Sequence, residues 1–369
     1  MTAVTNEPGV IVEPAVISEQ RGQLGILTLN RPKAVNALNS TMVDAMLAQL
    51  EAWATDDSVK TVLVRGAGER GLCAGGDIVA IYQDMLGSEA GNATAAFWQE
   101  EYRLNLLISE YPKPYVALMD GLVLGGGVGI SAHGSHRVVT ERTRTGMPET
   151  TIGFVPDVGG TLLLSSSPGQ TGTHAALTAA HLNGADAIYL GLADHFVESK
   201  DLAALTAALE SEDADAAVGR FSSTAPESAL ERQREWLDAC YSAGSIEEIL
   251  AALRAAGAAG NADAAGAAET IAAKSPTAVK VTLESLRRVT GKSLADALAQ
   301  EFRVGLRCVE GPDFREGIRA QVVDKDRNPQ WNPATLAEVD AATVEGYFAP
   351  LGQRELVLER VEIKESGHE

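Results

Sequence analysis

Short apolar runs alternate with amphipathic stretches along the first part of the chain. The runs LGILTLN (24–30), KTVLVRG (60–66), KPYVALMDG (113–121) and HRVVTE (136–141) are rich in aliphatic residues and predict buried strands. Between them, STMVDAMLAQLEAWAT (40–55) and AAFWQEEYRLNLLISE (95–110) repeat apolar side chains every three or four residues, which predicts helices. Ser40 is the expected N-cap of the first helix. Strands that alternate with helices indicate an α/β domain.

The pattern changes after about residue 205, where strand-like runs nearly vanish and alanine dominates. EEILAALRAAG (247–257) and SLADALAQEFRVGLRCV (293–309) predict helices, and the Ala/Gly tract at 251–268 is expected to form helix pieces. The apolar stripes of such helices need a partner surface. We therefore expect an α/β domain over residues 1–209 and a helical region over 210–369 that packs on it.

The charge balance narrows the range of partners. The 369 residues include 50 acidic and 30 basic side chains, a formal charge of −20, so nucleic acid is an unexpected partner. No run of about 18 apolar residues predicts a membrane span. The start of the chain lacks a basic segment followed by an apolar run, so no signal peptide is expected. Three widely spaced cysteines argue against a disulfide framework, and we expect a cytoplasmic protein.

Two glycine-rich stretches, CAGGD (73–77) and GLVLGGGVG (121–129), each follow a predicted strand. Glycine lets a ligand approach the backbone closely, and a helix that starts near Gly126 would leave its first N–H groups free. Two such loops can each point one N–H at a single oxygen, which makes an oxyanion hole. Either loop alone is more often a plain turn. Gly127-x-Gly129-x-x-Ala132 also fits a loose dinucleotide-binding fingerprint, but a lone match is weak.

The stretch MPETTIGFVPDVGG (147–160) holds two acids, Glu149 and Asp157, in otherwise apolar sequence. Burial raises the pKa of a carboxyl group, and a second acid nearby raises one of the pair further. Such a carboxyl can act as an acid or base near neutral pH. Alternatively, Glu149 caps a helix or pairs with Arg142 or Arg144.

Other candidate residues have weaker support. Cys73 has no histidine close in sequence, so we expect a small buried thiol. His133 and His136 have too few acidic neighbours to form a metal site, and no metal or separate cofactor is expected. GISAH (129–133) has histidine where a serine hydrolase motif needs its second glycine.

Four ordered motifs resemble the crotonase (enoyl-CoA hydratase/isomerase) superfamily. They are NRPKAVNALN (30–39), CAGGD (73–77), GGGVG (125–129) and MPE (147–149). The resemblance implies a spiral of ββα turns, here with a helical C-terminal region, and an acyl-CoA thioester as substrate. It also implies that the N–H groups of Gly76 and Gly126 stabilise the thioester oxyanion.

Within that superfamily, hydratases use two glutamates to handle water. This chain has Glu149 at one of those positions but Gly129 at the other, and it adds Asp157 where hydratases carry no acid. EEY (100–102), MPETTIGFVPDVGG and the helical tail together resemble the 3-hydroxyisobutyryl-CoA hydrolase family. That resemblance implies hydrolysis of a short 3-hydroxyacyl-CoA in valine degradation, with Glu149 and Asp157 in catalysis and Glu101 lining the acyl pocket.

The resemblance also implies where the coenzyme A part of the substrate binds. We expect CoA to pass RPKAV (31–35) and AGGDI (74–78), with contacts from Lys33, Val35, Ala74, Asp77 and Ile78. Arg31 and Lys33 are the candidate positive charges. The alternatives are a hydratase or isomerase of the same superfamily and a non-catalytic acyl-CoA-binding protein. The resemblance is also compatible with a homo-oligomer.

Overall fold

The computed structural model describes residues 13–88 and 91–358. Its strands form two sheets, one of six strands in the order β1-β2-β3-β5-β7-β9 and one of three in the order β4-β6-β8. All neighbouring strands are parallel except β1 and β2, which are antiparallel. The strands are β1 (Val16–Arg21), β2 (Leu24–Leu29), β3 (Thr61–Gly66), β4 (Gly71–Cys73), β5 (Tyr115–Met119), β6 (Leu122–Leu124), β7 (His136–Val139), β8 (Arg144–Gly146) and β9 (His195–Phe196).

The chain winds as a spiral. Each of three successive turns places one strand in the large sheet and the next in the small sheet: β3 then β4, β5 then β6, and β7 then β8. The large-sheet strands β2, β3 and β5 are long apolar runs because both faces of the sheet are covered. The segments that follow β4, β6 and β8 come together because those three strands lie side by side and parallel. The expected spiral fold is confirmed.

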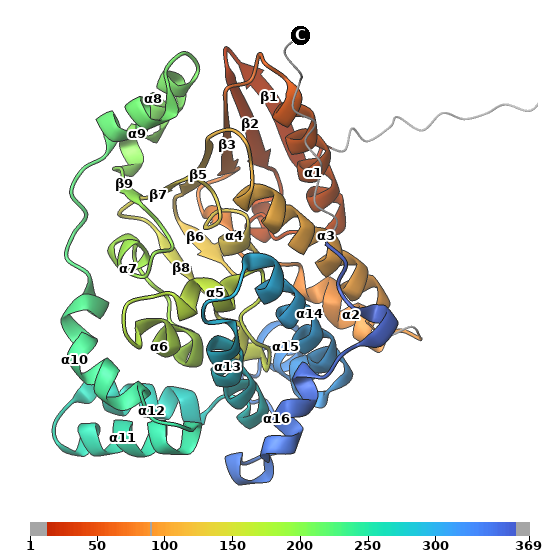
Figure 1. Ribbon diagram of the computed structural model, residues 1–369, viewed down its shortest axis with the longest axis vertical. Helices are drawn as coiled ribbons and strands as arrows, with labels where there is room; N and C mark the ends of the chain where they lie inside the picture. The colour runs from red at the N-terminus through yellow and green to blue at the C-terminus, as the bar shows by residue number, and fades with distance from the viewer. Residues whose placement is uncertain (1–12, 89–90, 359–369) are drawn as a thin grey trace, which may run out of the picture.

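Helices of the α/β part cover the sheets and the ends of the spiral (Figure 1). They include α1 (Ser40–Thr55), α2 (Ile78–Leu86), α3 (Asn92–Ser109), α4 (Gly126–Gly129), α5 (Gly160–Ser165), α6 (Thr171–Thr178), α7 (Gly184–Tyr189), α8 (Leu202–Leu209) and α9 (Ala214–Phe221). The first helix begins at the expected residue, but its N-cap is Asn39, whose side chain accepts a hydrogen bond from the Met42 N–H. The N-cap expected at Ser40 is therefore wrong by one residue.

The C-terminal part of the described chain is helical. Its helices are α10 (Ala229–Tyr241), α11 (Ile246–Ala258), α12 (Ala262–Ala272), α13 (Pro276–Val289), α14 (Leu294–Glu310), α15 (Pro312–Ile318) and α16 (Ala341–Phe348). A π-helix at Arg319–Val323 continues α15, and short 3₁₀ turns lie at Pro32–Ala34, Glu149–Ile152, Ser199–Asp201, Leu336–Glu338 and Gly352–Arg354. The Ala/Gly tract forms α11 and α12, which pack against each other.

The C-terminal helices pack directly on the α/β part. Helix α13 contacts α5 and α6, α14 contacts α3 and α5, and α15 contacts the 3₁₀ turn that begins at Glu149. Figure 1 shows α13, α14 and α15 against the middle of the molecule, beside α5 and α3. One hydrophobic core runs through both parts, and it includes Tyr102 of α3 and Phe302 of α14.

A second core lies on the other face of the large sheet. It joins strand residues such as Ile26 and Val116 to Leu205 of α8 and Val218 of α9. The boundary expected between residues 209 and 210 falls between these two helices and stays a prediction. Among the described residues, no helix combines the length and apolar character needed to cross a bilayer.

Candidate active site

A cavity of about 440 Å³ opens where the loops after β4, β6 and β8 converge. Its walls carry the aromatic side chains of Phe97, Trp98, Phe154 and Phe314. Trp98, Phe154 and Phe314 form a stack, with ring centroids of Phe154 and Phe314 4.4 Å apart. Eight of the ten residues expected in the site line this cavity: Gly76, Gly126, Glu149, Asp157, Glu101, Ala74, Asp77 and Ile78.

Two buried carboxyl groups lie against the triple glycine. A methyl group on Gly125 would come within 2.8 Å of Glu149 Oε1, and one on Gly126 within 2.7 Å of Glu101 Oε1. Gly125 also has φ +50°, a conformation that glycine adopts at no steric cost. These two glycines therefore let the acids approach the backbone more closely than any other residue would.

The amides of Gly76 and Gly126 lie close together at this point. The Cβ position of residue 126 is 3.4 Å from the Gly76 nitrogen. Within the described residues, neither amide donates a backbone hydrogen bond, although the adjoining Leu38 and Asp77 amides both do. Gly126 is the first residue of α4, where amides have no partner within the helix. The cavity therefore has two free N–H donors beside two carboxyl groups.

Asp157 reaches the cavity from a strained turn. Its Oδ2 accepts a hydrogen bond of 2.9 Å from the hydroxyl of Tyr102, the residue after Glu101. The next residue, Val158, has φ +52°, an unusual conformation for a β-branched residue. Strain of this kind persists only where the surroundings over-determine it, and it clusters at functional sites.

Burial dominates the electrostatics of these acids. It raises the pKa of Glu149 well above the usual range, and the charge of Asp157 raises it further. Burial is also the main reason why the pKa of Glu101 is raised, and the charge of Asp157 is the second reason. Burial also raises the pKa of Asp157 to about 7, although the Tyr102 hydrogen bond acts in the opposite direction. The protonation of Glu149 therefore depends on that of Asp157, and the two acids can take up and release a proton as a pair near neutral pH.

The sequence of the chain is similar to those of known acyl-CoA enzymes. The sequence model of the enoyl-CoA hydratase/isomerase family matches residues 24–348. The chain belongs to this family. It is 41% identical over 355 residues to "3-hydroxyisobutyryl-CoA hydrolase, mitochondrial" of Danio rerio, covering 93% of this chain and 91% of that protein. The human protein of the same name is 38% identical over 356 residues, covering 92% and 90%.

Solved structures share the fold of this family member. A carnitinyl-CoA dehydratase from Mycobacterium thermoresistibile is 51% identical, with a TM-score of 0.90, covering 94% of this chain and 99% of that one. An enoyl-CoA hydratase from Rhodobacter sphaeroides 2.4.1 is 38% identical, with a TM-score of 0.87, covering 93% and 99%. The expected superfamily is confirmed.

Two residues expected to contact CoA do not line the cavity. Lys33 is exposed, and Val35 lies in a tight loop with φ +47°. The neighbouring Arg31 is already paired, since its guanidinium lies 2.9 Å from Asp77 Oδ2. The charge expected from Arg31 is thus largely neutralised, while Lys33 has no ion pair within the described chain.

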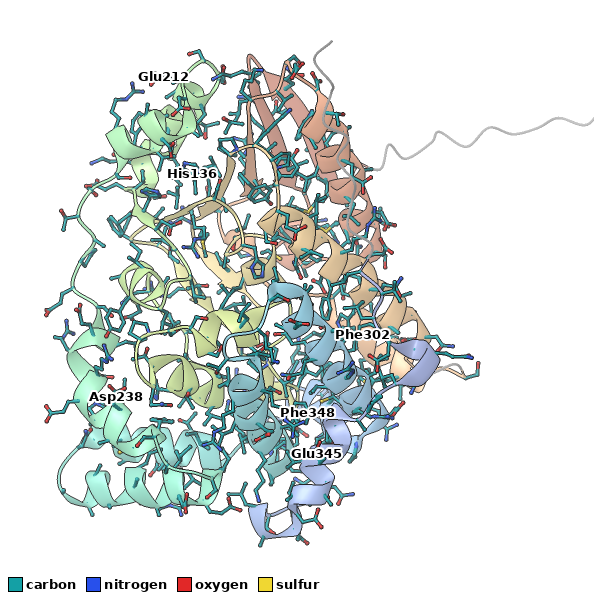
Figure 2. All side chains as sticks on the ribbon, viewed as in Figure 1. His136, Glu212, Asp238, Phe302, Glu345 and Phe348 are labelled. Carbon is teal, nitrogen blue, oxygen red and sulfur yellow. The ribbon has the colours of Figure 1, made fainter. Side chains whose placement is uncertain are left out.

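A Ser–His–Asp arrangement lies elsewhere in this family member. Ser135 Oγ is 2.9 Å from His136 Nδ1, and His136 Nε2 is 2.9 Å from Asp215. However, Ser135 Oγ also accepts the Tyr115 N–H, and none of the three residues lines the cavity. Figure 2 shows His136 well apart from Phe302 of α14. This arrangement holds β7 and α9 together and lies outside the cavity that contains the free amides.

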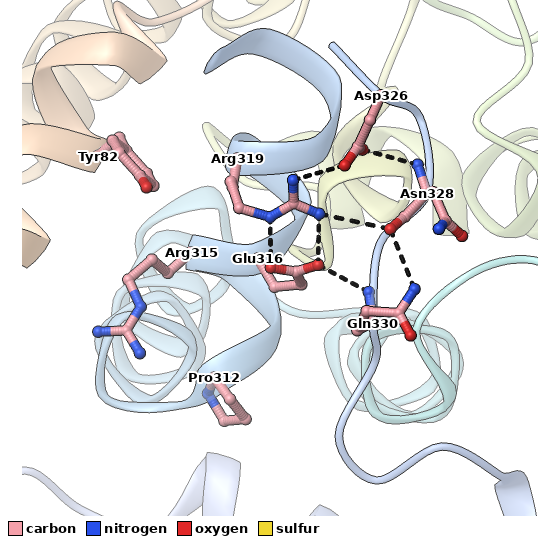
Figure 3. A pocket seen from close by; sticks show the side chains of 8 residues that line it. All are labelled: Tyr82, Pro312, Arg315, Glu316, Arg319, Asp326, Asn328 and Gln330. Atoms are coloured by element: carbon pink, nitrogen blue, oxygen red, sulfur yellow. Dashed lines mark hydrogen bonds and ion pairs between the residues drawn. The ribbon is translucent and has the colours of Figure 1, made fainter. Parts of the chain in front are cut away.

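A larger hollow of about 690 Å³ lies on the surface between α2 and α15. Figure 3 shows Arg319 at its centre, paired with Glu316 and Asp326. Arg319 also pairs with Asp324. The hollow contains no carboxyl group as deeply buried as those of the cavity, so we assign the chemistry to the cavity.

Several residues of the site were not expected from the sequence. Tyr102 is one, although its place in the motif EEY is a local signal. His133, whose Nε2 lies 2.8 Å from the Val158 carbonyl, and Glu301 of α14 are others. Asn105 is fully buried with no partner for either side-chain polar atom. No pattern near these last three residues indicates that they meet the Asp157 turn.

The raised pKa of Asp157 predicts a pH-dependent stability. Its carboxyl titrates at about 7 when folded and near 4 when unfolded, so the folded state holds the proton more tightly. Below about pH 4, Asp157 is protonated in both the folded and the unfolded state, so its ionisation does not lower the free energy of unfolding. As pH rises from about 4 to 7, the free energy of unfolding falls. We expect Asp157→Asn to be more stable than the wild type at pH 8 by more than about 1 kcal/mol.

Urea unfolding at pH 5, 6, 7 and 8 measures this difference. The gap between Asp157→Asn and wild type should widen with pH, whereas a variant at the exposed Asp57, Asp57→Asn, should follow the wild type. A constant gap across this range would contradict the assignment.

Position 129 has no room for a side chain. A methyl group on Gly129 would come within 2.7 Å of Val158 Cβ and 2.9 Å of Asn105 Nδ2. We expect Gly129→Ala to lower the free energy of unfolding by about 1–3 kcal/mol, as overpacking does. Gly266→Ala is the matched control, because Gly266 lies inside α12 with nothing within 4 Å. It should raise stability by about 0.5–1 kcal/mol. Equal effects of the two variants would disprove the crowding.

Proposed function

We propose that this protein hydrolyses the thioester of a short 3-hydroxyacyl-CoA, such as 3-hydroxyisobutyryl-CoA, to the free acid and CoA. One observation carries most weight: Glu149 and Asp157 face one cavity with two free amides, while position 129 has neither an acid nor space for one. The names of the relatives that are about 40% identical support the same reaction.

In the proposed reaction, the thioester oxygen accepts hydrogen bonds from the Gly76 and Gly126 N–H groups. Each such donor is typically worth about 2.7–4 kcal/mol of transition-state stabilisation. Water then adds to the thioester carbon and the carbon–sulfur bond breaks. Glu149 either takes a proton from this water or attacks the carbon itself to form an anhydride that water opens.

The coupled acids are suited to both halves of this reaction. Near neutral pH, the pair of Glu149 and Asp157 holds a proton while Tyr102 donates to Asp157. Such a pair accepts a proton from the attacking water and returns one to the sulfur of the departing CoA. Because the surrounding cavity is largely apolar, the coupling between the two acids is strong.

Glu101 provides the preference for a hydroxylated acyl group. Its Oε1 is buried with no hydrogen-bond partner, and an unsatisfied buried polar atom costs about 1–3 kcal/mol. A hydroxyl on the substrate supplies that partner. Lys33, Val35, Ala74, Asp77 and Ile78 remain the residues that we expect along the path of CoA, with Ala74, Asp77 and Ile78 on the cavity wall.

A hydratase or dehydratase is the second candidate, because the two similar solved structures carry those names. Against it, the second hydratase glutamate is replaced by Gly129, whose surroundings Val158 and Asn105 already fill. A non-catalytic acyl-CoA-binding protein is the third candidate. Such a protein has no need of two acids whose pKa values are raised in one cavity.

The setting of the reaction is also part of this hypothesis. All three cysteines are free and buried, as expected for a reducing compartment, and we propose the cytoplasm. The relatives named above are mitochondrial by name. We also propose a homo-oligomer, which sedimentation velocity would test.

Two assays with the wild-type protein test the reaction. A thiol reagent follows free CoA from 3-hydroxyisobutyryl-CoA, and ultraviolet absorbance follows the double bond of a 2-enoyl-CoA. We expect CoA release, at least about 100-fold faster than from isobutyryl-CoA, because a site built for a hydroxyl rejects an analogue that lacks it. Efficient hydration of the enoyl-CoA without CoA release would leave only the family assignment standing.

Substitution of the acids tests the mechanism. Glu149→Gln keeps the shape of the side chain and removes its basicity, so kcat should fall by at least about 10²–10⁴ while acyl-CoA still binds. Asp157→Asn should also lower kcat. The double variant should be little worse than the worse single variant, since the two acids act as a unit. If the loss of kcat in the double variant equalled the product of the losses in the two single variants, the two acids would act independently.

The oxyanion hole is best tested at Gly76. A methyl group there meets only Phe97, at 3.6 Å, in ordinary contact, so Gly76→Ala should retain activity within a few-fold. Gly76→Pro, unlike Gly76→Ala, lacks the backbone N–H, and we expect its kcat/KM to fall by about 100-fold or more. Circular dichroism and thermal unfolding check that both variants fold. Equal kcat/KM values for folded Ala and Pro variants would exclude the Gly76 amide.

A further inference from the structure

The mechanism above leaves one buried acid without a role. Glu301 of α14 is 1% exposed, and its carboxyl group accepts three hydrogen bonds from the turn that follows Asp157. Oε2 accepts the Gly159 N–H at 2.7 Å, and Oε1 accepts the Thr161 N–H at 2.9 Å and the Thr161 hydroxyl. A helix from the C-terminal region thus holds the loop that carries a proposed catalytic acid.

This loop needs to be held, because Val158 is strained at φ +52°. Glu301 binds the turn on one side of Val158, and His133 binds the Val158 carbonyl on the other, at 2.8 Å. The close packing of Gly129 against Val158 completes the enclosure. Without such contacts, a β-branched residue relaxes to a conformation with negative φ and turns its neighbours with it.

We propose that Glu301 is a positioning residue, whose carboxyl group holds the strained turn so that Asp157 faces Glu149 and the thioester. This inference rests on the hydrolysis proposed above. Glu301 does not line the cavity and touches no reacting atom. Its effect passes through the backbone of residues 159–161 to Asp157.

Glu301 adds a further acid to a region that has almost no compensating cation, and burial raises its own pKa to about 8. The groups that face it are Asp157 on the held turn, Tyr102 on α3 and Glu149 on its 3₁₀ turn. His133 packs against Gly159, and burial lowers its pKa to about 4, so it is neutral. Burial and then the charge of Asp157 raise the pKa of Glu149 and of Tyr102 most, and the charge of Glu301 adds to both increases.

Two substitutions separate the effect of Glu301 on the position of the turn from the effect of its charge on the neighbouring acids. Glu301→Gln keeps the reach of the side chain but loses its charge and faces a backbone N–H with its own NH₂ group. Glu301→Asp keeps the charge but is one methylene too short to reach all three donors. Glu310→Gln is the matched control, because Glu310 is an exposed glutamate on the same helix.

We expect both Glu301 variants to lower kcat for CoA release by about 10- to 100-fold, with KM within two-fold, because misplacement of one catalytic group has effects of this size. Only Glu301→Gln should move the alkaline side of the pH profile of kcat, to lower pH, because it removes an acid that titrates at about 8 and whose charge adds to the raised pKa of Glu149. Glu310→Gln should match the wild type in both respects.

Each outcome decides the question. A folded Glu301→Gln variant with wild-type kcat and an unchanged pH profile would overturn the positioning role. If that variant does not fold, Thr161→Val replaces it, since it removes one donor to Glu301 and keeps the size of the side chain. Unchanged kcat in Thr161→Val would then overturn the role, and a lowered kcat at constant KM would support it. Absence of CoA release by the wild type would instead refute the proposed hydrolysis.

Discussion

Burial of four carboxyl groups in one apolar region is the constraint on which the rest of this structure depends. Glu101, Glu149, Asp157 and Glu301 are each less than 8% exposed. No arginine or lysine pairs with any of them within the described chain. Buried charges without a counter-ion are costly, so each group must hold a proton or accept strong hydrogen bonds. Tyr102 and the backbone of the 159–161 turn provide those bonds to Asp157 and Glu301. Burial raises the pKa of all four acids, and it raises those of Asp157 and Glu301 only to about 7 and about 8.

The spiral fold makes this crowding achievable. Three parallel strands of the small sheet end side by side, so glycine-rich loops and the Asp157 turn meet at one edge. Gly125 and Gly126 allow carboxyl groups to approach the backbone, and the free amides of Gly76 and Gly126 lie in the same space. The same fold serves dehydratases and hydratases, as the similar solved structures indicate by name. Under the proposed hydrolysis, Gly129 and Asp157 are the positions that separate this site from that of a two-glutamate hydratase.

Much of the site was predictable from the sequence because its members lie in short motifs. Glu149 and Asp157 are eight positions apart in apolar sequence, and Gly76 and Gly126 lie in glycine-rich loops after strands. The structure brings all four to one cavity. Lys33 and Val35 belong to an equally local motif but lie outside the lining, because a tight loop with two successive positive φ angles turns them away. The motif alone therefore did not show which of its residues line the cavity.

The sequence by itself determined strands β2, β3, β5 and β7, helices α1 and α3, the helical tail and the acids Glu149 and Asp157, because periodicity and residue type act over short distances. Strand β1 was not predicted, since most of its residues are exposed and it has no apolar run. Strands β4, β6 and β8 were not predicted from the sequence, since three residues are too few to show a periodic pattern. Only the tertiary structure decided that Glu301 holds the Asp157 turn, that Asn105 and Val158 fill the space beside Gly129, and that Ser135 is tied to the backbone. Those contacts join segments distant in sequence, and folding alone brings them within hydrogen-bonding reach.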